Sequence, residues 1–84
     1  MNVASSLEKT AFYFPEHTAV IEGDKVISYA LFKQDVRRIA SALNRRGIRP
    51  GDHVGLCAPN AYEWLVFYFG VLGAGAVAVT FSHL

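Results

Sequence analysis

The chain has 84 residues, room for a single domain, and a chain this short buries only about 60% of the surface that it exposes when unfolded. Hydrophobic residues make up 52% of it and charged residues 18%, below the roughly 25% charged share of an average globular chain, so we expect surfaces that further protein covers. The net charge of +1 excludes a strong overall field for gathering polyanions, and nucleic acid is not expected as a partner.

The first third of the chain predicts a short helix followed by a β-hairpin. Residues 3–14 carry apolar side chains at helical spacing. Pro15 ends this pattern because proline disfavours the helical conformation in the residue before it. The next stretch, "HTAVIEGDKVISY", has apolar residues on both sides of Gly23-Asp24, which predicts two short strands joined by a tight turn.

A second, amphipathic helix is predicted between Ser28, which can cap its start, and Gly47, which can end it. Its apolar stripe recurs at i, i+4, i+7 and i+11, and consists of Phe32, Val36, Ile39 and Leu43. The basic residues lie largely off that stripe: Lys33, Arg37, Arg38, Arg45 and Arg46. We expect them to form a solvated helix face, with a contact patch as the alternative.

The last part of the chain predicts a strand, a helix and a second strand. The turn at Pro50-Gly51 precedes an apolar strand over residues 53–58, and Asn60 can cap a helix from Ala61 to about residue 72. Strand residues follow at 76–81. The whole order is an α/β fold of one domain, residues 1–84, with helix, β-hairpin, and then helix-strand-helix-strand. Its strand–helix–strand part is a parallel crossover unit.

The glycine stretch "FGVLGAGAVAV" allows two further interpretations besides a helix end, a glycine turn and a buried strand. It contains G-x-G-x-x-A, but a dinucleotide site needs these glycines after a strand and before a helix, and here the order is reversed. The uncharged run of residues 64–81 would reach roughly 27 Å as a helix, and Gly70 and Ala74 form a small-xxx-small pair. The glycines break that run and no lysine or arginine flanks it, so no membrane span is expected. A small single-span membrane protein is kept as the second alternative function.

Residue types that carry chemistry do not gather in this sequence. His53 and Cys57 are the closest pair of potential metal ligands, but in a strand they lie about 13 Å apart. His17 and His83 have no ligand partner nearby in sequence, and no phosphate loop or nucleophile elbow is present. The carboxylates are expected in surface or capping roles: Asp35, Asp52 and Glu63. We therefore assign no catalytic, cofactor-binding or metal-binding residue.

The single cysteine and the first six residues bear on location. One cysteine excludes an internal disulfide, which fits a reducing compartment. Residues 1–6, "MNVASS", lack the basic head and apolar stretch of a secretion signal. A cytoplasmic location is therefore expected.

The stretch from "ISYALFKQDVRRIASALNRRGIRPGDHVGLCAPN" to "GAVAVTF" resembles the N-terminal part of the adenylate-forming (AMP-binding) enzymes, of the acyl-CoA synthetase or AMP-dependent ligase type. The resemblance covers about residues 7–81. The family's recurring features appear here as Ser28-Tyr29, Ala40 to Leu43, Gly47-Ile48, Gly51-Asp52-His53-Val54, Asn60 and Gly75-Ala76-Val77-Ala78-Val79. The chain departs from the family's pattern at Leu31-Phe32, where Glu-Leu is usual, and at Thr80, where proline is usual.

The resemblance implies a partial N-terminal subdomain that serves as scaffold. A full-length parent would use ATP, Mg and coenzyme A to convert a carboxylate into an acyl-adenylate and then a thioester. The family's phosphate loop, ribose-binding Asp and late catalytic Lys do not occur in these 84 residues, so the chain alone is expected to be inactive. Its expected partner is the remainder of the parent enzyme or a second copy of itself, and the alternative function is a stand-alone non-catalytic interaction module.

Overall fold

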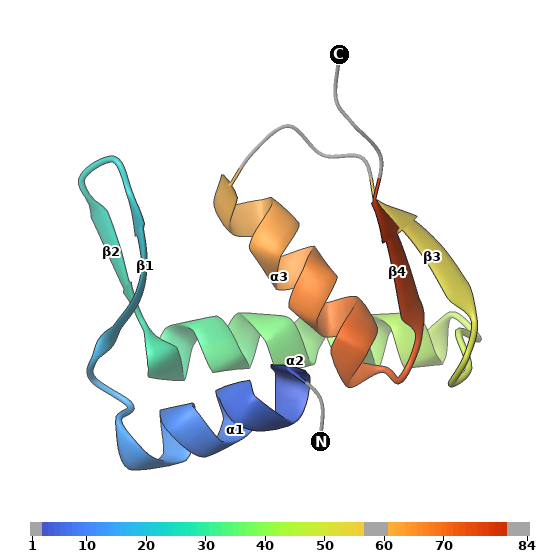
Figure 1. The fold of residues 1–84 in the computed structure, drawn as a ribbon, viewed down its shortest axis with the longest axis horizontal. Helices are drawn as coiled ribbons and strands as arrows, with labels where there is room; N and C mark the ends of the chain where they lie inside the picture. Colours follow the sequence, from blue (N-terminus) through green and yellow to red (C-terminus); the bar gives the residue numbers. More distant parts are fainter. Residues whose placement is uncertain (1–2, 57–60, 81–84) are drawn as a thin grey trace.

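The fold is known from a computed structural model, which describes residues 3–56 and 61–80 (Figure 1). The elements follow in the order α1 (Val3–Tyr13), β1 (Thr18–Glu22), β2 (Lys25–Ser28), α2 (Tyr29–Arg45), β3 (His53–Leu56), α3 (Ala61–Gly73) and β4 (Val77–Thr80). This is the predicted order, and each boundary that the structure describes lies within two residues of the expected one. The predicted cap Asn60 and the expected strand ends at 57–58 and 81 lie outside the described residues.

Two separate two-stranded sheets flank the helices (Figure 1). Strands β1 and β2 pair antiparallel around a turn in which Gly23 has a φ of +62°, a left-handed conformation that glycine adopts without strain. Strands β3 and β4 pair in parallel, in register from His53 opposite Val77 to Leu56 opposite Thr80. The α3 helix connects them, which confirms the predicted crossover unit.

Helix α2 begins and ends as its sequence predicts. The Ser28 hydroxyl accepts a hydrogen bond from the Leu31 N–H at 3.2 Å, which satisfies one donor of the first turn. At the other end Gly47 has a φ of +92°, and the Ile48 N–H donates to the Leu43 carbonyl at 3.0 Å. This is a Schellman turn, which satisfies the last carbonyls and folds Ile48 back against Leu43 in the core.

Helix α3 ends in a second Schellman turn, which decides between the interpretations of the glycine stretch. Gly75 has a φ of +80°, and the Ala76 N–H donates to the Val71 carbonyl at 3.1 Å. Strand β4 starts two residues later, so the helix end, glycine turn and strand are confirmed. In the described segments, every helix falls short of the length and apolar character that a bilayer crossing requires.

The apolar core has two parts, one on each side of the α2–α3 crossing. The first is built from α1, α2, the hairpin and α3, and its buried residues are Leu7, Ile27, Phe32, Val36 and Val66. The second joins the ends of α2 and α3 to the β3–β4 sheet, around Leu56, Val71 and Ala76. The predicted stripe of α2 is confirmed, because its four apolar residues contribute to one part or the other.

Gly70 sets the distance between α2 and α3. A Cβ atom at this position would lie 2.4 Å from Cγ2 and 2.7 Å from Cβ of Ile39, far inside van der Waals contact. The Ile39 Cβ belongs to the stiff base of a β-branched side chain, so it cannot rotate away. Glycine therefore lets the two helix backbones approach, which is the role a small residue has in close helix packing.

Tyr62 joins three elements at the start of α3. Its hydroxyl donates to Asp35 of α2 at 2.5 Å, and its backbone N–H donates to Glu22 of β1 at 3.1 Å. Burial, the hydrogen bond to Asp35 and the nearby charges of Asp35 and Glu63 raise the pKa of Tyr62 above its usual value. The hairpin thus supplies a carboxylate to the first turn of α3, where a helix favours negative charge.

We expect Gly70→Ala to destabilise the fold by about 1–3 kcal/mol, the usual cost of forcing a methyl group into a filled core. Alanine's better helix propensity would return only about 1 kcal/mol. Gly73→Ala is the matched control in the same helix, because a Cβ there would lie 3.5 Å from the Ala40 Cβ, an ordinary contact. Urea unfolding followed by circular dichroism measures both, and equal stability of the two variants would contradict the role given to Gly70.

We expect Tyr62→Phe to cost about 1 kcal/mol at neutral pH, the typical net worth of one hydrogen bond. The raised pKa means that folding favours the neutral phenol. The contribution of the neutral Tyr62 phenol to the free energy of unfolding is complete below the ordinary tyrosine pKa of about 10. It is lost as the pH rises above that value. The urea midpoints of wild type and variant should therefore converge at alkaline pH. Tyr13→Phe removes a phenol at an exposed position and is the control. A difference in urea midpoint between wild type and Tyr62→Phe that widens above pH ~10 would contradict the role given to the Tyr62 hydroxyl.

Candidate functional site

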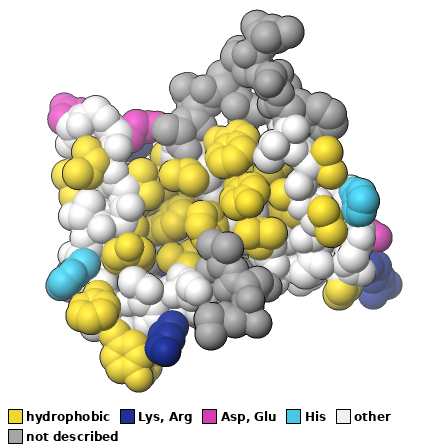
Figure 2. Space-filling view, in the orientation of Figure 1, with side chains coloured by type: hydrophobic (Ala, Val, Ile, Leu, Met, Phe, Trp, Pro, Cys, Tyr) yellow, Lys and Arg dark blue, Asp and Glu magenta, His cyan; other side chains and the backbone are white. Residues whose placement is uncertain are grey.

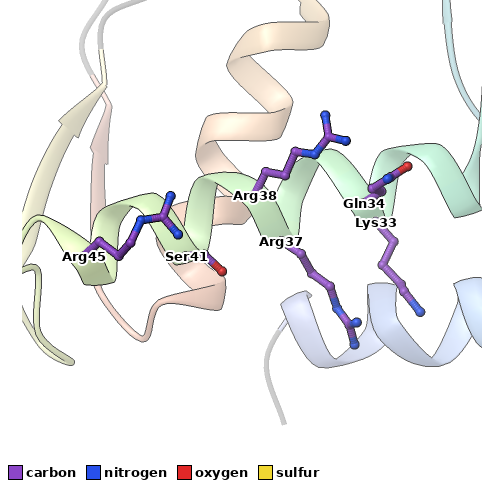
Figure 3. Close-up of a pocket in the computed structure, with 6 residues that line it drawn as sticks. All are labelled: Lys33, Gln34, Arg37, Arg38, Ser41 and Arg45. Atoms are coloured by element: carbon purple, nitrogen blue, oxygen red, sulfur yellow. The ribbon is translucent and has the colours of Figure 1, made fainter.

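A shallow trough of about 620 Å³ runs along the outer side of α2 (Figure 3). Six side chains line it: Lys33, Gln34, Arg37, Arg38, Ser41 and Arg45. All six come from one helix. The trough is therefore a ridge-and-groove feature of the α2 surface rather than a cleft between elements.

The spacing of the α2 sequence places these side chains together. Lys33, Arg37, Ser41 and Arg45 follow one another every fourth residue, about 6 Å apart along the helix axis, and each step turns about 40° further round the helix. Lys33 and Arg37 therefore point toward α1, whereas Arg45 points away from it (Figure 3). The inward stripe of α2, which includes Phe32 and Val36, is buried in the core. The basic residues therefore face away from the core, as the sequence predicted.

One of the four cations of the trough is paired. Arg37 of α2 donates to both carboxylate oxygens of Glu8 in α1, with the Nε–Oε2 distance 3.1 Å. The hydrogen bond to Glu8 and its negative charge raise the pKa of Arg37. Within residues 3–56 and 61–80, neither Lys33 nor Arg45 takes part in an ion pair. The trough thus has free positive charge at both of its ends.

The trough and the apolar surface lie on opposite sides of the molecule. Figure 2 shows hydrophobic side chains gathered in the middle of the face on which α3 lies in front of α2. In the close-up of the trough, α2 lies in front of α3 (Figure 3). The trough therefore lies on the side of α2 that faces away from this apolar patch.

An apolar groove of about 340 Å³ opens between α1, β1 and α3. Its lining includes Leu7 of α1, Val20 of β1 and Leu65 and Phe69 of α3. Several large apolar side chains elsewhere are also exposed, such as Phe67 at 42% and Val77 at 44%. The described residues do not cover this apolar surface by themselves.

Only two of the potential metal ligands that the sequence offered lie among the described residues, His17 and His53. His53 is exposed at the start of β3, while Cys57 and His83 lie outside the described residues. His17 packs against the Phe14 ring, with ring centroids 5.0 Å apart. Among the residues that the structure describes, no three His, Cys, Asp or Glu side chains converge in a way that could hold a metal ion.

The carboxylates were expected in surface or capping roles, and Asp35 differs because it joins α2 to α3 in a partly buried hydrogen bond. Asp35 accepts from the Tyr62 hydroxyl, and Asp52 accepts from the Arg49 N–H at 2.7 Å within the turn before β3. Glu63 lies in the first turn of α3. No local pattern indicated the roles of Glu22 and Glu8, whose partners lie 40 and 29 residues away in the chain.

The described glycine turns do not fit the phosphate groups of a nucleotide. Gly47 and Gly75 both follow the C-terminal end of a helix, which carries partial negative charge. A phosphate site needs the opposite end of a helix, with its free N–H groups. No nucleotide-binding role is therefore assigned to these residues.

Comparisons with known proteins show that this chain is similar to one segment of much longer proteins. A CoA ligase of Rhodococcus jostii, 3-[(3aS,4S,7aS)-7a-methyl-1,5-dioxo-octahydro-1H-inden-4-yl]propanoyl:CoA ligase, is 41% identical over 75 residues, which are 89% of this chain and 15% of the ligase. The putative acyl-CoA synthetase YngI of Bacillus subtilis is 43% identical over 76 residues, 88% of this chain and 14% of that protein. The chain thus spans about a seventh of the length of these relatives.

The structural likeness is equally extensive. The crystal structure of the inhibitor-bound N-terminal domain of FACL13 from Mycobacterium tuberculosis matches 96% of this chain with a TM-score of 0.89 and 32% identity, and 21% of that domain is covered. Residues 7–84 match the family described as AMP-binding enzyme. The resemblance noted in the sequence is thereby confirmed, and this chain belongs to the AMP-binding enzyme family.

Proposed function

We propose that the chain is the N-terminal scaffold piece of an AMP-forming carboxylate ligase of the acyl- or aryl-CoA synthetase type. The observation that carries the proposal is the match of 96% of the chain to one part of a ligase N-terminal domain. In this role α2 and α3 hold the β3–β4 sheet in place, and the sheet continues into strands from later sequence. The chain itself supplies no catalytic residue.

The apolar surface supports a scaffold role. Helix α3 is apolar on all sides, and a helix of this kind is covered by protein all round in a large domain. Here α2 packs against α3 most extensively and the other described elements cover further parts of it, while Phe67 of α3 and Val77 of β4 remain exposed. Parallel sheets are covered on both faces in complete domains, so the bare face is where the remainder of the ligase would pack.

For the whole enzyme we propose the reaction of its relatives' class. A carboxylate and ATP would give an acyl-adenylate and pyrophosphate, and a thiol such as coenzyme A would then displace AMP to form the thioester. Bound Mg²⁺ would neutralise phosphate charge in the first step. The described residues of this chain fit none of these groups, so ATP, Mg²⁺ and coenzyme A would bind to other segments. The cytoplasmic location expected from the cysteine content stays a prediction.

A chimera tests the scaffold role directly. Residues 7–84 of this chain would replace the matching segment of the Rhodococcus jostii ligase, and acid-dependent ATP–pyrophosphate exchange would be measured. We expect the chimera to retain exchange within roughly tenfold, because scaffold residues act through packing rather than through contact with the reacting atoms. The 84-residue chain alone should stay at background with a panel of fatty and aryl acids.

A chimera with Gly70→Ala serves as the packing control and should lose stability before it loses the ability to bind acid. A soluble, folded chimera without any exchange would contradict the scaffold proposal. Robust acid-dependent exchange by the 84-residue chain alone would contradict the absence of catalytic residues in it.

We also expect the isolated chain to self-associate. Covering about 400 Å² of apolar surface per chain would contribute roughly 10 kcal/mol for each chain, whereas association itself costs about 4–15 kcal/mol for the pair. The two-stranded β3–β4 sheet also offers open edges that pair readily with other strands. Light scattering over a dilution series measures the mass, and a single species at 9.2 kDa at high concentration would contradict this expectation.

A further inference from the structure

Three consecutive aromatic residues form an exposed cluster where α1 ends, which we call the aromatic corner. Phe12 is 74% exposed and Tyr13 64% exposed, and Phe14 is about half exposed. The rings of Phe12 and Tyr13 meet edge to face, with centroids 5.1 Å apart. Helix α1 buries Leu7 and Ala11 instead. The aromatic corner therefore projects away from the core rather than contributing to it.

The backbone holds the aromatic corner in place. Just after it, the carbonyls of Pro15 and His17 accept hydrogen bonds from the N–H groups of Ala30 and Tyr29, at 3.0 and 2.9 Å respectively. These donors belong to the first turn of α2, where a helix leaves its N–H groups without partners of its own. Phe14 also packs against the His17 ring. The rings are thus presented on a fixed support, so little backbone freedom would be lost on binding.

The position and shape of the aromatic corner favour a bilayer over a protein as its partner. It lies at the opposite end of the molecule from the β3–β4 sheet, where the remainder of the ligase is proposed to pack (Figure 1). Hydrophobic rings project from the outline of the molecule over the end of α1 (Figure 2). A protein partner would need a pocket complementary to each projecting ring, whereas the boundary of a lipid bilayer accepts aromatic rings without one.

Two lysines lie near the aromatic corner. Lys9 is exposed on α1, four residues before Tyr13. Lys33 lies one turn beyond the start of α2, and its side chain points toward α1 (Figure 3). Glu16 is the carboxylate of the turn itself, while Glu8 of α1 is already paired with an arginine of α2. The two lysines outnumber the unpaired carboxylate, which is complementary to anionic lipid head groups.

We infer that the aromatic corner binds the surface of a lipid bilayer that contains anionic lipids. The rings would enter the boundary between head groups and acyl chains, and the lysines would contact anionic head groups. At roughly 200 Å² for each aromatic side chain, the exposed parts of the three rings amount to about 400 Å². A patch of this size on a protein surface is often a binding site. The contact is with one leaflet, which distinguishes it from a membrane span.

Flotation with vesicles tests the inference. The 84-residue chain is mixed with vesicles of phosphatidylcholine and phosphatidylserine, at about 3:1 to give an anionic surface, and centrifuged in a density gradient. Vesicle-bound protein rises in the gradient, whereas self-associated protein sinks. We expect the wild type to float and Phe12→Ala/Tyr13→Ala to bind at least about tenfold more weakly, because two aromatic side chains lose their burial. Alanine favours the helix, and circular dichroism shows whether the fold is kept.

The matched control is Ile21→Ala/Val26→Ala. These two side chains lie opposite each other in the β1–β2 hairpin and are 69% and 65% exposed, so the control removes apolar groups of similar exposure at a different place. It should change the affinity for vesicles less than about twofold, since scattered exposed apolar residues have no such role.

The contribution of the lysines is measured separately. Lys9→Gln/Lys33→Gln should weaken binding to the anionic vesicles about tenfold and leave binding to vesicles of phosphatidylcholine alone unchanged. Wild-type binding should weaken but persist in about 0.5 M NaCl, because salt screens the charges and not the burial of the rings.

Any of four outcomes would overturn the inference. The first is a wild-type chain that does not float with the anionic vesicles. The second is an equal loss of affinity in the aromatic and hairpin double variants. The third is complete loss of binding in high salt, which would assign the effect to charge alone. The fourth is unchanged flotation of Phe12→Ala/Tyr13→Ala together with lost self-association in light scattering, which would make the aromatic corner an interface between copies of the chain.

Discussion

The close approach of α3 to α2 at Gly70 is the constraint on which the rest of the molecule depends. The two halves of the core lie on either side of this crossing, and each half holds one of the small sheets. At one end of α3 Tyr62 connects to the hairpin and to α2, and at the other end the turn at Gly75 leads directly into β4. A change in the distance between the helices would therefore displace both sheets together.

The apolar character of α3 explains why its sequence allows different interpretations. A helix covered all round by protein and a helix surrounded by lipid need the same kind of side chains. What separates them here is the chain after Leu72, where glycine permits a left-handed turn and valines begin a strand. Local backbone chemistry, rather than hydrophobicity, decides the structure of this stretch.

Most of the fold could be predicted because its boundaries are set by local signals. Ser28, Gly47 and the glycines after α3 act on their own neighbourhood, and the strand–helix–strand order leaves a parallel crossover as the natural arrangement. The contacts of Glu22 with Tyr62 and of Glu8 with Arg37 could not be predicted, because they join segments brought together only by the packed helices. The basic residues of α2 were visible in the sequence, but the position of their trough opposite the apolar face follows from how α3 and α1 pack.

The capping contact from Glu22 to Tyr62 has a consequence for the order in which the chain folds. It spans 40 residues, so it closes only after a long loop has been ordered, whereas the two Schellman turns form between residues at most five apart. Helix α3 is thus secured early at its glycine end and late at its first turn. During synthesis from the N-terminus, the Glu22 carboxylate would stay hydrated until α3 emerged. The first turn of α3 would then be the last part of the helix to gain protection from hydrogen exchange.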